Sequence, residues 1–324
     1  MTVAARPLPQ SARSAVAAEP RSSARPAAGA VAGPLARPGD AAHLVPRCVG
    51  ALVLGGVVVG LLGACSDGPP GTVLDGPRVM ALIADPPTVG IDQIATVSLV
   101  TAVDGVLSPA AAPRWRACPP WAVVADPVRD CAEGAIDLAV DAEGRAVFDA
   151  GALAAAWGVT PPPAPDAVCG EAVVDVIVVV EADLAGARLI ATKQVEVGAA
   201  PPARRNPEIT RVLIGGEPVE DGAVLSAGAT LDLTVDVARD SLDLVCSDGA
   251  TTPDKLEDVR VYLYAGGGAT TDDNDLEITD VEGASVAETK ALTLPDTPGT
   301  VPLWLVATDR GGGVSVVQRT LRVE

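Results

Sequence analysis

The chain has 324 residues, enough for roughly two domains of about 150 residues each, and only 2% of them are aromatic although 48% are hydrophobic. Its net charge of −19 is unevenly divided: the first 64 residues hold six Arg against one Glu and one Asp, which leaves 17 basic and 40 acidic residues for the remainder. A body this acidic repels nucleic acid and anionic lipid surfaces, so we expect no nucleic-acid partner.

The first 44 residues are dominated by Ala, Arg, Pro, Ser and Gly and show no apolar period. No methionine lies between Met1 and the apolar run that comes next. We therefore expect residues 1–44 either to be disordered or to lie upstream of the true start of translation. In the second case the initiator is a codon that is read here as Leu44 or Val45.

Residues 48–65 form an uncharged apolar run, CVGALVLGGVVVGLLGAC, that directly follows Arg47. A basic flank, an apolar stretch of about 7–15 residues and small residues before a cut are typical of a secretory signal. The run is also near the lower limit for a membrane span, which needs about 20 residues. By its length alone, the segment could be a cleaved signal or an uncleaved anchor.

The end of this run, Leu62-Gly63-Ala64-Cys65, resembles the lipobox of bacterial lipoproteins. The resemblance implies that a signal peptidase recognises Leu62, Gly63 and Ala64 and cuts before Cys65. It also implies that Cys65 carries lipid. Two or three acyl chains hold a protein stably at a membrane, where one chain alone is marginal. The membrane is thus an expected partner through the N-terminal acyl chains.

The same resemblance divides the region around the cut. Residues 45–64 become the signal peptide, and residues 65–76 a flexible tether rich in Gly and Pro. Ser66 follows the lipidated cysteine, which in this family implies the outer membrane. The surface and the periplasmic face both remain open.

The only histidine of the chain is His43, upstream of Cys65. A chain cut before Cys65 therefore contains no histidine. This excludes Ser-His-Asp and Cys-His catalysis as well as metal sites with histidine ligands.

Strand signals recur through the rest of the chain. Residues 229–237 alternate with the period of a half-buried strand, which places four side chains on one face: Leu231, Leu233, Val235 and Val237. The first half shows the same alternation in Val97 and Leu99 against Thr96 and Ser98. A short helix is predicted at 149–158, with Asp149 near its N-cap.

Two segments of 20 residues, 178–197 and 304–323, align without a gap, and each reads as strand, tight Asp/Gly turn, strand. The pattern predicts a β-hairpin at the end of each of two related domains. These domains are expected at residues 77–198 and 207–324, with a linker at 199–206. Chance similarity between two hairpins is the alternative.

Several short strands, an early tryptophan-bearing strand and a closing hairpin over about 120 residues resemble an immunoglobulin-like β-sandwich. The closing phrase VATDRGGGVSVVQRTLRV (306–323) is similar to the last two strands of bacterial Ig-like and PKD-like domains. The resemblance implies an all-β fold of two tandem Ig-like β-sandwiches. Trp115 would be the core tryptophan of the third strand, and Leu263 or Tyr262 would take that place in the second half.

Four cysteines follow Cys65, and an even number in an exported chain indicates disulfides, with three possible pairings. Cys118 and Cys131 lie in one Pro-rich connection and are the favoured pair. Closing this short loop would stabilise the fold by about 3 kcal/mol in the chain-entropy model. A bridge between Cys169 and Cys246, across the two domains, is less favoured. A metal role is not expected, because CxxC spacing is lacking.

The densest carboxylate cluster is TTDDNDLEITD, residues 270–280. Asp272, Asp273 and Asp275 in it are weak candidates for Ca²⁺ ligands. The segment lacks the glycine and the distal glutamate of an EF-hand loop, so a solvated turn is the favoured interpretation. We expect neither a metal nor a cofactor.

A hydrolase of the glycosidase type needs only two suitably spaced carboxylates, so the acid content does not exclude one. Such sites line clefts rich in aromatic residues, whereas this chain has four Trp, two Tyr and one Phe. Trp115 and Trp304 fall in predicted strands and are expected in the core. Trp121 and Trp157 lie in less regular stretches, where packing is favoured over a ligand surface.

These patterns predict a lipid-anchored envelope protein without catalytic residues. Its expected role is surface binding or adhesion, or a structural function, with an unknown protein or glycan as partner. A periplasm-facing accessory subunit of an envelope complex is the alternative, and a carboxylate-based hydrolase a remote one.

Overall fold

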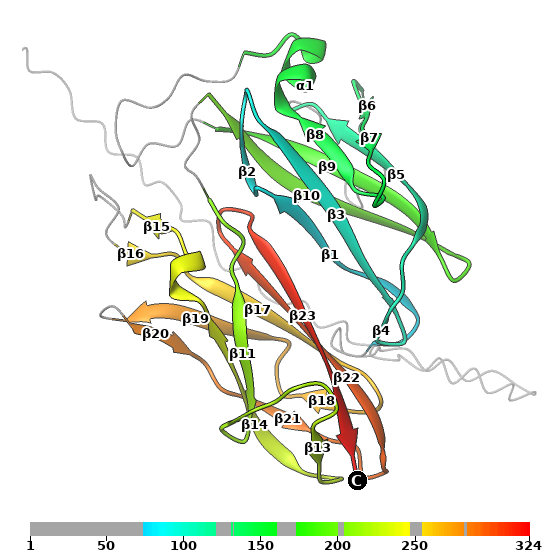
Figure 1. Ribbon diagram of the computed structural model, residues 1–324, viewed down its shortest axis with the longest axis vertical. Coiled ribbons are helices and arrows are strands. Elements are labelled where there is room, and N and C mark those ends of the chain that lie inside the picture. The colour runs from blue at the N-terminus through cyan, green and yellow to red at the C-terminus, as the bar shows by residue number, and fades with distance from the viewer. Residues whose placement is uncertain are drawn as a thin grey trace, which may run out of the picture. The chain divides into compact units, whose positions relative to one another are not determined.

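The computed structural model describes residues 74–120, 131, 133–160, 173–199, 204–246, 255–281 and 284–324. In this part of the chain nearly every regular element is a β-strand, and the strands form two sandwiches of two sheets each (Figure 1). The predicted signal peptide, lipobox and N-terminal extension lie outside the described residues. None of the helices within the described ranges is long and apolar enough to cross a membrane.

The first sandwich has sheets of strand order β1-β3-β8-β7, with β4 beside β3, and β2-β10-β9-β5-β6. The strands of the former are β1 (Pro77–Asp85), β3 (Ile94–Val103), β4 (Val106–Leu107), β7 (Ala139–Val140) and β8 (Ala146–Asp149). Those of the latter are β2 (Thr88–Gly90), β5 (Ala111–Cys118), β6 (Ile136–Asp137), β9 (Val173–Leu184) and β10 (Ala187–Gly198). This is the immunoglobulin order, in which strands A, B, E and D face strands C, F and G.

The second sandwich repeats this order in the sheets β12-β11-β14-β21-β18 and β13-β23-β22-β17-β19-β20. The strands of the former are β11 (Ile209–Ile214), β12 (Glu217–Pro218), β14 (Thr230–Val237), β18 (Thr270–Thr271) and β21 (Lys290–Thr293). Those of the latter are β13 (Val224–Leu225), β17 (Val259–Ala265), β19 (Asp275–Val281), β20 (Ala284–Ala287), β22 (Gly299–Asp309) and β23 (Val314–Val323). Two strands beyond the third main strand, β19 and β20, resemble the extra pair of variable-type domains.

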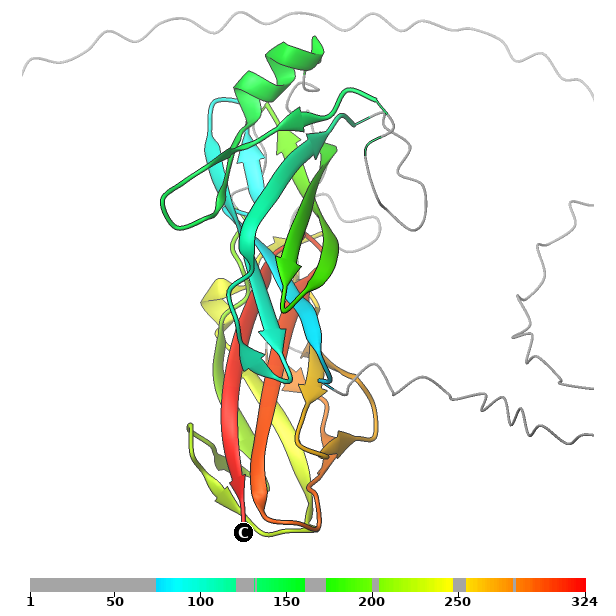
Figure 2. The ribbon, with the colours of Figure 1, turned by 90° about the vertical axis from the view of Figure 1, so that its right-hand side faces the viewer.

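Small elements complete the described chain. A 3₁₀ turn, η1 (Arg239–Ser241), precedes the short hairpin of β15 (Leu244–Val245) and β16 (Lys255–Leu256). One α-helix lies in the described residues, α1 (Ala150–Trp157), at one end of the first sandwich (Figure 2). Its start confirms the prediction, because the Asp149 side chain accepts a hydrogen bond from the Ala152 amide at 2.9 Å. Gly158 ends it in the left-handed conformation.

Both predicted closing hairpins are present. β9 pairs with β10 and β22 with β23, each in an unbroken antiparallel register. The alternation predicted for residues 229–237 is confirmed in β14, where Leu233, Val235 and Val237 are buried. The repeat therefore corresponds to the last two main strands of each sandwich.

Each sandwich has its own apolar core. Trp115 on β5 is 2% exposed and lies in the first core, as predicted for the third main strand. At the equivalent place in the second sandwich, Leu263 lies in the core, whereas Tyr262 on the same strand packs on a different cluster. The choice between these two residues, which the sequence left open, is thus decided by the register of β17.

Strand β22 is buried on both faces. Seven consecutive residues, 301–307, are buried, which is the pattern of a strand covered on each side. Leu303 and Leu305 lie in the core of the second sandwich, whereas Trp304 and Val306 lie in other clusters. Those clusters also contain residues of the first sandwich, namely Leu74, Met80, Ala81 and Ala102. Trp304 is therefore buried, as expected, but between the two sandwiches instead of inside one.

Polar contacts join the same faces. Trp304 Nε1 donates to the Gly105 carbonyl at 2.7 Å, and Gln318 Nε2 donates to the same oxygen at 3.2 Å. Gly105 has a φ of 76°, and a Cβ there would collide with the Pro302 side chain. Asn206 Nδ2 donates to the Ala84 carbonyl at 2.9 Å, and its Oδ1 accepts from the Val314 amide at 2.7 Å. The segment predicted as a linker is thus hydrogen-bonded to both sandwiches.

The last residues of the predicted tether are hydrogen-bonded to the folded part of the chain. Leu74 is buried, and its amide donates to the Ala265 carbonyl at 3.1 Å. The Gly76 amide donates to Asp104 Oδ1 at 2.7 Å. Residues 74–76, which the composition assigned to a flexible tether, therefore belong to the folded part.

The favoured disulfide is present. Cys118 at the end of β5 is bonded to Cys131, with a Cα–Cα distance of 5.4 Å. Both cysteines are buried and pack on Val179. Cys246 is also disulfide-bonded, while Cys169, its proposed partner, lies outside the described residues.

Candidate functional site

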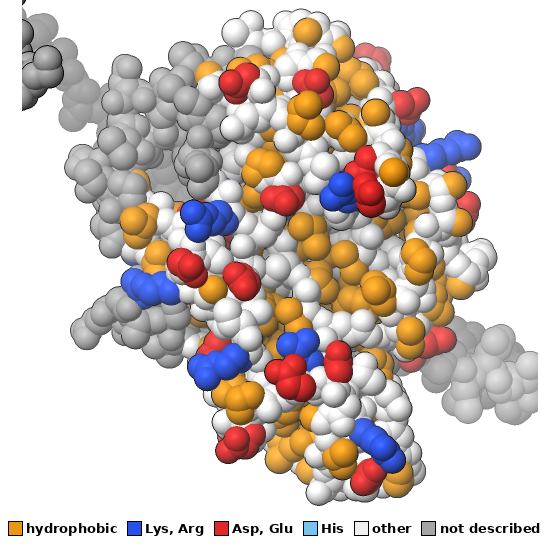
Figure 3. All heavy atoms as spheres, in the orientation of Figure 1, with side chains coloured by type: hydrophobic (Ala, Val, Ile, Leu, Met, Phe, Trp, Pro, Cys, Tyr) orange, Lys and Arg blue, Asp and Glu red, His pale blue; other side chains and the backbone are white. Residues whose placement is uncertain are grey.

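Charged side chains are mixed on the surface. On the face seen in Figure 3, acidic and basic side chains are interspersed, with hydrophobic side chains between them. No single-sign field on that face points to a partner, but a hollow on the first sandwich carries a local excess of positive charge.

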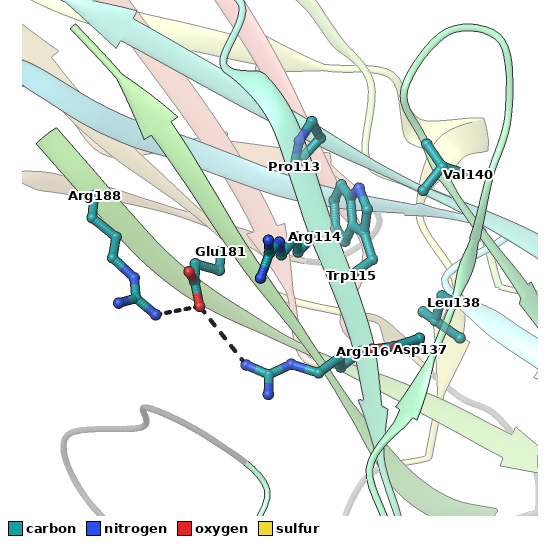
Figure 4. Close-up of a pocket in the computed structure, with 9 residues that line it drawn as sticks. All are labelled: Pro113, Arg114, Trp115, Arg116, Asp137, Leu138, Val140, Glu181 and Arg188. Atoms are coloured by element: carbon teal, nitrogen blue, oxygen red, sulfur yellow. Dashed lines mark ion pairs between the residues drawn. The ribbon is translucent and has the colours of Figure 1, made fainter. Parts of the chain in front are cut away.

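A pocket of about 610 Å³ lies on the first sandwich, beside strand β5 (Figure 4). Strands β5, β6, β7, β9 and β10, with Leu138 between β6 and β7, supply its lining. We call it the arginine pocket, and its residues are Pro113, Arg114, Trp115, Arg116, Asp137, Leu138, Val140, Glu181 and Arg188. Its volume is in the range of small-molecule sites.

A β-bulge shapes the pocket. Ala111 pairs with Asp183 and Arg114 with Glu181, so β5 advances three residues while β9 advances two. Within the bulge Ala112 has a φ of 39°, a left-handed conformation that costs a non-glycine residue about 1–2 kcal/mol. Bulges redirect side chains and often lie beside functional sites. Here the bulge sets the direction of Arg114 and of the strand that follows it.

Beyond the bulge, side chains alternate across β5. Trp115 points inward to the core, while Arg114 is exposed and Arg116 half-buried on the other face. Arg114 and Arg116 therefore lie on the same face of the strand, two residues apart. Residues two apart on a strand are separated by about 7 Å, so one small anion can lie between them.

Glu181 on β9 organises the other guanidiniums. Arg188 Nη2 lies 2.5 Å from Glu181 Oε2 and Arg116 Nη2 lies 3.9 Å from it, and the two side chains approach from different sides (Figure 4). The hydrogen bond from Arg188 lowers the pKa of Glu181, and the charges of Arg114 and Arg116 act in the same direction. The carboxylate is thus ionised at neutral pH and serves as a fixed counter-ion.

Arg114 has no such partner. In the described part of the chain it forms no ion pair, although its charge acts on Glu181. Three guanidiniums line the pocket against two carboxylates, Asp137 and Glu181. The pocket therefore carries an excess of positive charge within a chain of net charge −19.

The sequence contained this signal only in part. In the motif Arg114-Trp115-Arg116, strand alternation predicts an inward tryptophan flanked by outward charges, and the structure confirms this. What was missed is that Arg188, 72 residues further on than Arg116, lies on the same sheet face with Glu181 between them. Only the pairing of β5, β9 and β10 brings these residues together.

Other predicted site residues are placed as follows. The lipidation residue Cys65 and the peptidase motif Leu62, Gly63 and Ala64 lie outside the described residues, as does Trp121. Trp157 packs on the first core, and its Nε1 donates to the Gly134 carbonyl at 2.7 Å. The packing interpretation of Trp157 is thus confirmed.

The calcium candidates have protein partners. Asp273 Oδ2 lies 3.3 Å from Lys290 Nζ, and Asp275 Oδ2 lies 3.0 Å from Arg260 Nε. Asp272 Oδ1 accepts from the Ala291 amide at 2.9 Å. Among the described residues, no group of three or more His, Cys, Asp or Glu could hold a metal ion.

A second group of charges lies where the sandwiches meet, and two of its members, Lys193 and Glu257, are buried. We call it the ionic joint, and its members are Lys193, Glu196, Arg204, Asp243, Glu257 and Asp309. Arg204 Nε lies 3.7 Å from Glu196 Oε2, the Lys193 ammonium donates to the Gly312 carbonyl, and Asp309 Oδ1 accepts from the Gly313 amide at 2.7 Å. With Arg205, whose charge also acts on Asp243, four carboxylates face three cations.

Burial changes the protonation of the joint. Burial, with the charges of Asp309 and Asp243, raises the pKa of Glu257 to about 7. Burial lowers the pKa of Lys193 to about 8, although Asp309 and Glu196 oppose this. Glu257 Oε1 accepts from the Asp243 amide at 2.9 Å. The lining of the arginine pocket includes no residue of the joint, which we regard as structural.

No protein-family model matches the sequence, and no curated protein matches it. Among solved structures, the Yersinia pseudotuberculosis adhesin InvE is 14% identical with a TM-score of 0.22, over 74% of this chain and 58% of the adhesin. A chimeric titin Z1Z2 is 15% identical with a TM-score of 0.19, over 78% of this chain and 98% of titin Z1Z2. Escherichia coli alpha-2-macroglobulin is 13% identical with a TM-score of 0.24, over 76% of this chain and 17% of the macroglobulin.

This chain spans less than two thirds of the adhesin and of the macroglobulin. The assignment to Ig-like β-sandwiches follows from the strand order and the registers of the two sandwiches themselves.

Proposed function

We propose that this protein is a lipid-anchored, non-catalytic module of the bacterial outer membrane that binds a partner through its first sandwich. The proposal rests on one combination: a lipobox ending at Cys65, and behind it a body whose strained strand β5 presents Arg114 without an ion pair among the described residues. The lipobox supports anchoring, and the pocket supports binding.

The chemistry of the pocket supports binding over catalysis. Its lining contains no Ser, Thr, Cys, Lys or His, so it offers no nucleophile with an adjacent base of these types. A glycosidase would need one carboxyl group with a raised pKa as the general acid. The pKa of Glu181 is instead lowered by Arg188, and this carboxylate is unsuited to that role.

A second function is favoured by a different observation. Val106 and Leu107 on the two-residue strand β4 are about 60% exposed, at 61% and 59%. Adjacent exposed apolar residues are common at contacts with another protein. They favour a periplasm-facing accessory subunit that would be covered in an envelope complex.

Protease treatment of intact cells distinguishes the two functions. A surface-binding module is expected to be cleaved in whole cells, whereas an accessory subunit is expected to be protected until the outer membrane is opened. Recovery of the protected protein in a complex would support the second function and contradict the first.

Replacing Cys65 with serine is expected to abolish fatty-acid labelling and to leave the protein unprocessed or in the soluble fraction. The thiol of Cys65 is the atom that would carry the lipid, and a serine hydroxyl does not replace it. Metabolic labelling with a fatty acid, followed by membrane fractionation, measures both effects.

Cys48→Ser is the matched control, because Cys48 lies in the same apolar run but outside the lipobox. This variant is expected to be labelled and anchored like the parent protein. Continued labelling of Cys65→Ser would overturn the lipoprotein assignment. Equal loss in both variants would show that the change in the apolar run, and not the lipobox cysteine, is responsible.

A further inference from the structure

The arginine pocket contains an ion pair, Arg188 with Glu181, and beside it Arg114, which forms no ion pair among the described residues. Glu181 already accepts from Arg188 at 2.5 Å, and Arg116 lies further away at 3.9 Å. Arg114 contributes charge to the same place without an ion pair in the described chain. One more anion would balance the three guanidiniums of the pocket. The strand geometry places this anion between Arg114 and Arg116.

The backbone supports a role beyond folding. An ordinary strand would pass this position without the bulge and without the left-handed Ala112, whose φ of 39° carries a cost in stability. Strain of this kind persists where the surrounding structure needs it, and it often lies at binding sites. The bulge ends at Arg114, which forms no ion pair in the part of the chain that the structure describes.

Arginine selects the chemistry of the ligand. A guanidinium presents its N–H groups in a planar fork that matches the two oxygens of a carboxylate. Trp115 is only 2% exposed, so its ring is not available for stacking on a neutral sugar. Recognition in this pocket must therefore depend on charge, with Pro113 and Val140 offering apolar contact at the sides.

The shape of the site favours a sugar acid over an extended acidic peptide. A peptide that adds a strand needs an unbroken edge of backbone donors and acceptors. Next to Arg114, β5 has Pro113, which lacks an N–H, and the bulge interrupts the ladder. The exposed Arg114 and Val140 leave the pocket open to solvent, so a ligand can continue beyond it as a longer chain.

We propose that the arginine pocket binds the carboxylate of a uronic acid unit in an acidic polysaccharide, held by Arg114 and Arg116. This rests on the proposed function as a binding module and names the class of its ligand. Glu181 acts as the counter-ion that holds Arg188 and Arg116 in place. Asp137 lies opposite Arg116 in the register of β5 and β6. Its negative charge repels the bound carboxylate and so lowers the affinity for the sugar acid.

The test is titration calorimetry with the full-length protein in detergent, using trigalacturonate as the ligand and neutral galactotriose as its uncharged counterpart. Trigalacturonate is expected to bind and galactotriose is not. Arg114→Gln is expected to weaken binding about tenfold or more, because a hydrogen-bonded charge is removed from the ligand. Asp137→Asn is expected to strengthen it, since a repelling carboxylate is neutralised.

Arg211→Gln is the matched control, because Arg211 is an exposed arginine of the second sandwich that pairs with Asp236 at 2.5 Å. It is expected to leave the affinity unchanged. The unfolding midpoint of Arg114→Gln, measured by circular dichroism, is expected to equal that of the parent, since an exposed side chain without a partner adds little stability. A normal midpoint with lost binding separates a ligand role from a folding role.

Several results would overturn the inference: no binding of trigalacturonate, equal binding of galactotriose, or an unchanged affinity in Arg114→Gln. Binding of a tri-glutamate peptide in place of trigalacturonate would overturn the sugar assignment and point to a protein partner. None of these outcomes affects the Cys65→Ser experiment or the protease experiment. Failure of the ligand assignment and failure of the proposed function are therefore distinguishable.

Discussion

Trp304→Ala is expected to lower the free energy of unfolding by about 3–5 kcal/mol, the range for removing a fully buried tryptophan. Trp304 is 1% exposed and packs on Leu74, Met80 and Ala102. Truncation would open a cavity between the sandwiches and remove the donor to the Gly105 carbonyl. The loss should be visible in urea unfolding followed by far-ultraviolet circular dichroism.

The two sandwiches should also unfold less cooperatively in this variant. Their apolar contact is centred on Trp304 in one cluster and on Ala81, Val306 and Val314 in another. Without the first cluster, a single transition is expected to broaden or to separate into two. Calorimetry measures this directly, because each sandwich retains its own core.

Trp304→Phe is the matched control. It keeps an aromatic ring in the contact and loses the hydrogen bond, so a cost of only about 1 kcal/mol from that bond is expected. A Trp304→Ala variant as stable as the parent would show that the sandwiches do not form this contact in solution.

Glu257→Gln is expected to stabilise the protein at pH 8 by up to about 3 kcal/mol and to change its stability little at pH 4. Glu257 is 1% exposed, and its pKa rises from 4.5 to about 7 in the fold. Between these values the folded state holds a proton that the unfolded state has lost. The contribution of Glu257 to stability therefore falls as pH rises from 4.5 to 7 and is constant above.

Lys193 has the opposite dependence. Its pKa falls from 10.5 to about 8, so the unfolded state binds more protons between these values and stability rises with pH there. The ionic joint is thus least favourable between about pH 7 and pH 8. Denaturant unfolding of the parent and of Glu257→Gln from pH 4 to pH 9 isolates the contribution of Glu257.

The glutamine should fit the site. Its carbonyl can keep the hydrogen bond that Glu257 Oε1 accepts from the Asp243 amide, and its amide can donate toward the neighbouring carboxylates. Glu257 Oε2 has no hydrogen-bond partner among the described residues, so no existing bond is lost there. Glu217→Gln, at an exposed position on β12, is the control. A difference between parent and Glu257→Gln that did not grow from pH 4 to pH 8 would contradict the prediction.

Local pattern was enough to predict much of the fold. The alternation in β14, the two closing hairpins, the cap of α1 and the disulfide between Cys118 and Cys131 depend on residues close together in the chain. A period of two residues fixes which side chains share a face, and glycine and aspartate mark the turns. These features follow from short-range geometry, so they can be predicted from a single sequence.

The sequence by itself determined an acidic body with two strand-rich halves, and it predicts export and lipidation at Cys65. Only the tertiary structure decided which residues cover each face of the strands and sheets. The apolar run around Trp304 predicts a strand buried on both sides, yet only the packing shows that its second side meets the other sandwich. Likewise, Arg114, Glu181 and Arg188 meet only because β5, β9 and β10 pair in one sheet. The physical reason is that sequence period specifies direction within an element, whereas charge balance and burial depend on neighbours that are distant in the chain.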